Sequence, residues 1–383
     1  YVKFERQNSG ASLAKEEHFS PEDALAREGD VWTDSLDEAE LVIDGREFDR
    51  NKFLDAKATP ILFSSAALNF GVKQILDALV DLAQRDERVV GLSADLAKYT
   101  DLHILRDKMP DRFYQIGMAE QALLGAAAGL AMEGFIPFAS TYSVFATRRA
   151  YDFLCLDIAE ANLNVNMVCA LPGLTTGYGP SHQATEDIAI LRGMPNLTII
   201  DPCDAVDIEQ AVPQLAAHNG PTYMRILRGK VPRVLDEYDY TFELGKAKLL
   251  RDGSDVLLIS TGLMTERALE AAKALESDKV DVAVLHVPTL KPLDETAILA
   301  ELGKDRLVLT CENHTVIGGL FDAVAHTAVR DGVLRQITPI GLPDEFLAAG
   351  ALPTLDDRYG VSAVKIAEKI KSLLSPPCTD RVD

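Results

Sequence analysis

The stretch that decides the fold spans residues 112–121 and reads Arg112-Phe113-Tyr114-Gln115-Ile116-Gly117-Met118-Ala119-Glu120-Gln121. An apolar strand is predicted to end at Gly117, and a helix of small residues is predicted from Glu120 to Met132. The helix dipole favours a carboxylate at this position, so Glu120 alone indicates only a helix start. Whether Glu120 also has a functional role depends on the segments around it.

Apolar segments beyond this stretch alternate between strand and helix patterns. Strands are predicted at residues 89–92, 136–139, 164–171, 197–201 and 223–227, with helices between them. A second cycle follows residue 232, with strands at 255–260, 280–286 and 306–311 and helices at 265–275 and 319–329. This alternation predicts an α/β fold with two doubly wound, mostly parallel sheets.

The chain is predicted to have three parts. Residues 1–58 are polar and acidic, and we interpret them as an N-terminal extension that is partly disordered or draped on a partner. Residues 59–235 form the first predicted domain and residues 240–383 the second. The Gly, Pro and charged residues of 229–243 are typical of a linker.

Composition narrows the classes of function. The net charge of −21 over 383 residues argues against binding to nucleic acid or to anionic membranes. No apolar run reaches the roughly 20 residues of a membrane span, and the N-terminus lacks the apolar core of a signal peptide. The five cysteines lack disulfide-framework or zinc-ligand spacing, which fits a reducing cytoplasm. We therefore expect a cytoplasmic protein.

Two further segments carry chemistry-bearing side chains. Tyr142 and Phe145 are three residues apart and share a face if a helix starts there, although such a pair is more often part of a core. Two arginines, Arg148 and Arg149, follow in an otherwise apolar region. A Gly-rich loop then presents His182 just before a predicted helix start at 185–187. A single histidine in a loop is weak evidence of a functional site, but the order of the three segments along the chain is stronger evidence.

In this order, the segments resemble the transketolase family. Residues 112–228 resemble the pyrimidine-binding domain of transketolases, and the chain from residue 255 is similar to their C-terminal domain. The matching motifs are Gly-Met-Ala-Glu-Gln at 117–121, Pro-Ser-His-Gln at 180–183, Thr-Ile-Ile-Asp-Pro-Cys-Asp at 198–204 and Glu-Asn-His-Thr-Val-Ile-Gly-Gly-Leu at 312–320. The resemblance covers roughly residues 66–375 and is strongest to the C-terminal chains of two-chain transketolases.

The resemblance implies that thiamine diphosphate is the cofactor. It assigns Glu120 to N1′ of the aminopyrimidine, where a buried acid can hydrogen-bond the ring and shuttle a proton. In such a site the cofactor would supply the carbanion chemistry, and the protein would set its orientation and the movement of the proton. The resemblance also assigns cofactor contacts to Met118, Tyr142, Phe145, Arg148 and Asp95. Tyr142 and Phe145 would stack on the ring, and Arg148 stands where many relatives have an aromatic residue.

Substrate contacts implied by the family are partly altered. His182 would face the substrate carbonyl and its hydroxyls as an acid-base group or hydrogen-bond donor. Tyr178 stands where an Asp contacts a sugar hydroxyl, Leu171 replaces a His, and Asn69 replaces a phosphate-binding Arg. Arg228 matches a substrate-anion Arg, although a salt bridge near the linker explains it equally well. These changes argue against an ordinary pentose phosphate substrate.

The metal-diphosphate motif of the family, Gly-Asp-Gly followed by Asn, is missing. Gly29-Asp30 is followed by Val31, and nothing else in the sequence comes close. We therefore expect Mg²⁺ and the diphosphate to be held mainly by an N-terminal, diphosphate-binding transketolase subunit. The expected assembly is a two-plus-two heterotetramer with this chain as the central homodimer.

The leading hypothesis is thus a transferase subunit of carbohydrate metabolism, which moves a ketol unit from a ketose-like donor to an aldehyde. The alternative enzyme is the beta subunit of a 2-oxo-acid dehydrogenase, whose chains carry a similar acid motif and a Gly-rich loop with His. A third hypothesis is a non-catalytic scaffold, although an inactive copy should have lost Glu120.

Overall fold

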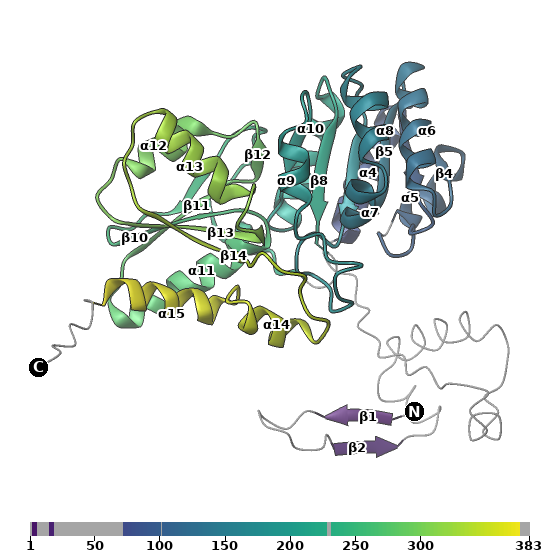
Figure 1. Ribbon diagram of the computed structural model, residues 1–383. Helices are drawn as coiled ribbons and strands as arrows, with labels where there is room; N and C mark the ends of the chain where they lie inside the picture. The colour runs from purple at the N-terminus through teal and green to yellow at the C-terminus, as the bar shows by residue number, and fades with distance from the viewer. Residues whose placement is uncertain (1, 6–14, 19–71, 101, 228–230, 376–383) are drawn as a thin grey trace, which may run out of the picture. The chain divides into compact units, whose positions relative to one another are not determined.

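A computed structural model describes residues 2–5, 15–18, 72–100, 102–227 and 231–375 of the chain (Figure 1). The chain divides into two compact units, residues 1–68 and 69–383. In the first unit, β1 (Val2–Glu5) pairs antiparallel with β2 (Lys15–His18). The rest of the predicted extension, together with Asn69 and Arg228, lies outside the described residues. Within the described part, no helix is long and apolar enough to cross a membrane.

The first sheet has seven strands in the order β12-β7-β8-β6-β5-β3-β4. Their bounds are β12 Thr289–Lys291, β7 Thr198–Ile200, β8 Thr222–Ile226, β6 Asn166–Ala170, β5 Ile136–Tyr142, β3 Val89–Ser93 and β4 Phe113–Gln115. Every neighbouring pair is parallel except β12 with β7. The edge strand β12 comes from the C-terminal half of the chain, so this half completes the first sheet.

The second sheet has five strands in the order β14-β13-β10-β11-β9. Their bounds are β14 Ile337–Leu342, β13 Leu307–Thr315, β10 Val256–Ser260, β11 Val282–His286 and β9 Lys248–Arg251. Only β9 runs antiparallel to its neighbour. The predicted α/β class with two mostly parallel sheets is therefore confirmed.

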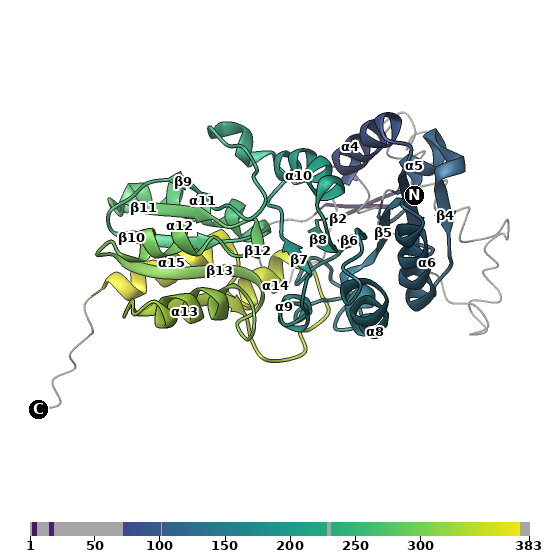
Figure 2. The ribbon, with the colours of Figure 1, turned by 90° about the horizontal axis from the view of Figure 1, so that it is seen from above.

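Helices cover both faces of each sheet (Figures 1 and 2). One face of the first sheet carries α4 (Val72–Arg85), α5 (His103–Lys108) and α10 (Ala205–Ala217), and the other carries α6 (Glu120–Met132), α8 (Tyr151–Phe153) and α9 (Asp187–Arg192). The second sheet lies between α11 (Leu263–Leu275), α14 (Leu352–Arg358) and α15 (Ala363–Leu374) on one face and α12 (Glu295–Leu302) and α13 (Leu320–Arg330) on the other. The apolar core beneath α6 and α9 continues beneath α12 and α13, so both halves share it.

Two predicted elements differ from the structure around the site. The strand before Glu120 is the short β4, which ends at Gln115 and is partly exposed. Within the part of the chain that the structure describes, β4 lies at the edge of the sheet with β3 as its neighbour, so fewer residues cover it than cover an inner strand. The helix predicted from Phe145 is divided into α7 (Ser143–Arg148), α8 and a π-helix at Leu154–Ala159, because the backbone of Ala150 leaves the helical region.

Two of the family-like motifs meet in a buried polar network between the halves. The Arg225 guanidinium donates to Asp187 and to Asp201, both at 2.9 Å, and to the backbone oxygen of Asn313 at 3.0 Å. Opposite Asp201, Gly262 has a φ of 54°, and a Cβ there would lie 2.5 Å from the carboxylate. Only glycine fits at this close approach.

His314 lies in the same motif and is fully buried. The backbone N–H of Ala189 donates to its Nε2 at 3.2 Å, and its Nδ1 contacts the carbonyl of Thr315 at 2.7 Å. Burial lowers the pKa of His314 to about 4, although Asp187 lies 4.0 Å and Glu312 3.8 Å away. The ring is therefore a neutral structural link between the two halves.

Candidate active site

The predicted catalytic residues gather at the carboxyl ends of four strands in the first sheet. β6, β5, β3 and β4 are adjacent and parallel, so the loops that follow them open at the same edge. Glu120 follows β4, Tyr142 ends β5 and His182 lies in the long loop after β6. β4 pairs with one side of β3 and β5 with the other. The order in which the chain adds strands to the sheet therefore changes direction at β3. Such switch points are where open α/β sheets bind ligands.

Glu120 is the first residue of α6 and is only 2% exposed. Its position at a helix N-terminus favours the carboxylate, as predicted. The Arg149 Nη1 donates to both carboxylate oxygens, at 3.1 and 3.3 Å. Neither the sequence pattern nor the family resemblance gives Arg149 a role, and its place in an otherwise apolar run is the signal that could have indicated one.

The aromatic pair lies on the neighbouring segment. Tyr142 precedes α7, and Phe145 lies in the first turn of that helix. Their ring centroids are 5.7 Å apart with an interplanar angle of 31°, so the two rings share a face, as expected from their spacing. The Arg149 guanidinium lies over the Phe145 ring, 4.0 Å from its centroid. One flat cation therefore contacts both the Phe145 ring and the Glu120 carboxylate.

His182 is surrounded by aromatic rings. Its ring centroid lies 5.5 Å from Phe145, 6.1 Å from Tyr142 and 5.6 Å from Tyr178, with edge-on geometry in each case. The hydroxyl of Ser181 contacts Nδ1 at 2.9 Å, so Nε2 is the nitrogen on the opposite side of the ring. Tyr178 itself is 68% exposed. The structure thus brings His182 together with the predicted stacking pair.

Arg148 points to a different set of groups from Arg149. Its Nε donates to Glu186 Oε1 at 2.5 Å, and its two terminal nitrogens donate to the carbonyls of Pro180 and Gln183, at 2.9 and 3.2 Å. The predicted contact of Arg148 with a cofactor ring stays a prediction.

Three other residues named by the sequence analysis lie near the same edge. Asp95 follows β3 with a φ of 61° and accepts a hydrogen bond from Gln115 Nε2 at 2.6 Å. Met118 is 77% exposed, and Leu171 is buried at the end of β6. Among the described residues, no recorded hydrogen bond or ion pair joins Asp95 to Glu120 or to His182.

The C-terminal half supports the His182 loop. The backbone N–H of Gly350 donates to the carbonyl of Gly177 at 3.0 Å, and a Cβ on Gly177 would lie 2.0 Å from the Gly350 oxygen. The buried Gln183 side chain donates to the carbonyls of Thr176 and Ala348, at 3.0 and 3.4 Å. The loop composition therefore reflects close packing between the two halves.

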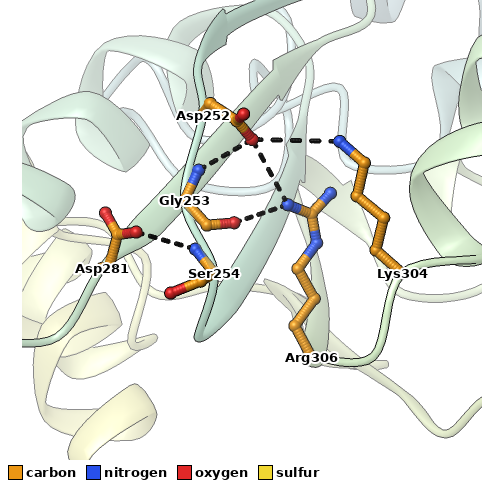
Figure 3. A pocket seen from close by; sticks show the side chains of 6 residues that line it. All are labelled: Asp252, Gly253, Ser254, Asp281, Lys304 and Arg306. Carbon is orange, nitrogen blue, oxygen red and sulfur yellow. Dashed lines mark hydrogen bonds and ion pairs between the residues drawn. The ribbon is translucent and has the colours of Figure 1, made fainter.

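A separate pocket lies in the second sheet, at the amino-terminal ends of β10, β11 and β13 (Figure 3). Arg306 donates to the carbonyl of Gly253 at 2.7 Å, Lys304 lies 3.9 Å from Asp252, and Asp281 accepts from the N–H of Ser254 at 2.9 Å. The charged groups are thus paired with each other or with the backbone. None of the predicted site residues lines this pocket.

The described residues include no group of three or more His, Cys, Asp or Glu side chains that could hold a metal ion. The chemistry-bearing groups at the first sheet are instead an acid, two arginines, a histidine and aromatic rings. This fold and this edge define a doubly wound α/β protein with a cluster of aromatic rings and a buried acid at the carboxyl ends of its parallel strands.

Comparison with known proteins identifies the family. Residues 72–233 match the family model of the transketolase pyrimidine-binding domain, and residues 245–366 match that of the transketolase C-terminal domain. A transketolase family protein of Sinorhizobium fredii is 68% identical over 302 residues, which cover 78% of this chain and 87% of that protein. This chain belongs to the transketolase family.

Two further relatives are informative. The 6-deoxy-6-sulfo-D-fructose transketolase subunit of a Clostridium species is 40% identical over 76% of this chain and 90% of its own length. A solved split-gene transketolase, described as an inactive beta4 tetramer, is 35% identical with a TM-score of 0.73, covering 79% of this chain and 98% of that one. Both are proteins of about the length of the matched region.

Proposed function

We propose that this chain is one subunit of a thiamine diphosphate-dependent transketolase-type enzyme, which transfers a ketol unit from a ketose-like donor to an aldehyde. The observation that carries the proposal is the buried Glu120, which Arg149 joins to the Phe145 ring of the aromatic pair at the carboxyl-terminal edge of the first sheet. Family membership and the split-gene relative support it. Glu120, His182 and the aromatic pair would carry the roles implied by the family.

The residues present fit an aminopyrimidine. The Phe145 face already accepts a flat cation at 4.0 Å, and that cation donates to Glu120. An aminopyrimidine is likewise flat and could stack on Phe145 while N1′ contacts the carboxylate. When bound, thiamine diphosphate supplies the electron sink for ketol transfer. Glu120 would hold the proton at N1′, and His182 would use Nε2 toward the substrate carbonyl or its hydroxyls.

A partner chain would supply the diphosphate and Mg²⁺ sites. The two matched family models account for pyrimidine-binding and C-terminal domains, and the relatives include a split-gene transketolase. Exposed apolar side chains surround α6, which suits a surface covered by another protein. These side chains are Met118, Met132, Tyr151, Phe153 and Leu156. We propose a heterotetramer in which this chain forms the central homodimer.

The test compares the purified chain with the chain assembled on a diphosphate-binding transketolase subunit. We expect ketol transfer only from the assembled pair, and turnover by this chain alone would contradict the split site. In the assembled pair, Glu120→Gln should slow exchange of the thiazolium C2 proton by about 100-fold or more, because it keeps the shape but cannot carry the proton. The control is Glu133→Gln, an exposed residue after the last turn of the same helix.

The substrate decides between the two enzyme hypotheses. Activity with hydroxypyruvate as donor supports ketol transfer, whereas activity with pyruvate alone supports a 2-oxo-acid dehydrogenase subunit. One relative is named for a sulfonated ketose, so 6-deoxy-6-sulfo-D-fructose belongs in the donor panel. Failure of the assembled wild-type pair to bind thiamine diphosphate would favour the scaffold hypothesis.

A further inference from the structure

Arg148 and the loop that carries His182 are joined by three hydrogen bonds. The Arg148 donors reach the carbonyl of Pro180 at 2.9 Å, the carbonyl of Gln183 at 3.2 Å and the Glu186 carboxylate at 2.5 Å. The two carbonyls lie on either side of His182 in the sequence. The two terminal nitrogens of the guanidinium therefore hold the turn that presents the histidine, and Nε holds Glu186, the residue before α9.

The chemistry of the contact explains why an arginine stands there. The guanidinium is planar and rigid, so its directed donors fix the orientation of two carbonyls that no strand or helix holds. A lysine ammonium could neutralise Glu186 but could not match the same three directions. Half-burial raises the pKa of Glu186, but the hydrogen bond and charge of Arg148 outweigh it, and the net pKa lies below its usual value. Glu186 therefore stays anionic and keeps the guanidinium in place.

We propose that Arg148 is a positioning residue, which holds the turn 180–183 so that the His182 ring stands among the aromatic rings at the sheet edge. The proposal rests on the proposed function, since His182 matters only if the substrate reacts there. It differs from the role implied by the family, which is contact with the cofactor ring. The donors of Arg148 point to the loop, and Arg149, not Arg148, lies over Phe145.

The two roles predict opposite results. If Arg148 positions His182, its loss should impair steps at the substrate and leave cofactor affinity unchanged. A misplacement of about 1 Å at a catalytic group can cost about 100-fold in rate. If Arg148 instead contacts the cofactor ring, its loss should weaken thiamine diphosphate binding first.

The experiment uses the assembled two-chain enzyme with Arg148→Met, Arg148→Lys and the milder Glu186→Gln, which leaves the arginine in place. The control is Arg330→Met. This change removes an exposed arginine at the end of α13 that pairs with Glu295 of α12. Three quantities are measured: thiamine diphosphate affinity by calorimetry, exchange of the thiazolium C2 proton, and ketol transfer with its pH profile.

We expect Arg148→Met to lower kcat/KM for ketol transfer about 10- to 100-fold. Cofactor affinity and proton exchange should stay within about threefold of wild type, because they depend on Glu120. Arg148→Lys should restore little, Glu186→Gln should show a smaller loss of the same kind, and the pH profile of ketol transfer should change shape.

A rise in the thiamine diphosphate Kd that accounts for the loss of turnover would overturn the proposal, as would full rescue by lysine. If Arg148→Met fails to fold, the Glu186→Gln result decides by the same criteria. Failure of the proposed function is separately visible, because the wild-type pair would then neither bind the cofactor nor exchange the proton.

Discussion

Replacing Arg149 with methionine should strengthen binding of thiamine diphosphate. In the structure, the Arg149 guanidinium makes the two contacts proposed for the aminopyrimidine, one with the Glu120 carboxylate and one with the Phe145 ring. A cofactor that takes these contacts must displace it. Arg149→Met keeps a flexible apolar stem and removes the competing cation.

The size of the expected change in Kd follows from the exposure of the ion pair between Arg149 and Glu120. The Arg149 side chain is 48% exposed, so its ion pair with Glu120 is screened and contributes about 1 kcal/mol at most. Its cation–π contact with Phe145 adds about 0.5–1 kcal/mol at such a site. Loss of both contacts should make binding more favourable by about 0.5–2 kcal/mol, which corresponds to about a 2- to 30-fold tighter Kd. The buried carboxylate left without its partner acts in the same direction.

The assay is calorimetric titration of thiamine diphosphate, with Mg²⁺, into the assembled pair. Arg106→Met serves as the control, because Arg106 is a similarly exposed arginine paired with Asp107 on α5. An unchanged or weaker Kd in Arg149→Met would refute the displacement argument. It would show instead that Arg149 stays beside Glu120 when the cofactor binds.

Three further predictions concern substrate choice and stability. Tyr178 offers one phenol where the family has an Asp, so a shorter or less polar aldehyde should react better than ribose 5-phosphate, and a highest specificity constant for ribose 5-phosphate would contradict this. The pKa of His314 is about 4 against a usual 6.5, so its contribution to stability is complete above pH 6.5 and is lost toward pH 4. Urea unfolding at several pH values should show a loss of up to about 1.4 kcal/mol per pH unit, which His314→Gln should flatten. Arg225→Met leaves Asp187 and Asp201 buried without their cation, and should lower the free energy of unfolding by about 3–5 kcal/mol, whereas an unchanged denaturation midpoint would contradict the network.

Local sequence patterns determined the elements that carry the site. The helix predicted from Glu120 to Met132 has the bounds of α6, because small apolar residues and an acid at the first turn specify it locally. The shared face of Tyr142 and Phe145 followed from their spacing, and the alternation of strands with helices gave the α/β class. A parallel sheet then brings the loops after its strands to one edge, whatever their distance in the sequence.

Tertiary structure decided which side chains meet at that edge. Arg149 contacts Glu120 across 29 residues of sequence, and Arg148 reaches Glu186 across 38. Adjacent residues on a helix point in different directions, so two neighbouring arginines acquired different partners. The strand β12 joined the first sheet from the C-terminal half, although its three residues carry too little periodicity to be recognised. Such pairings depend on the relative placement of distant segments, because hydrogen bonds and ion pairs form only within a few ångströms, and local periodicity does not encode that distance.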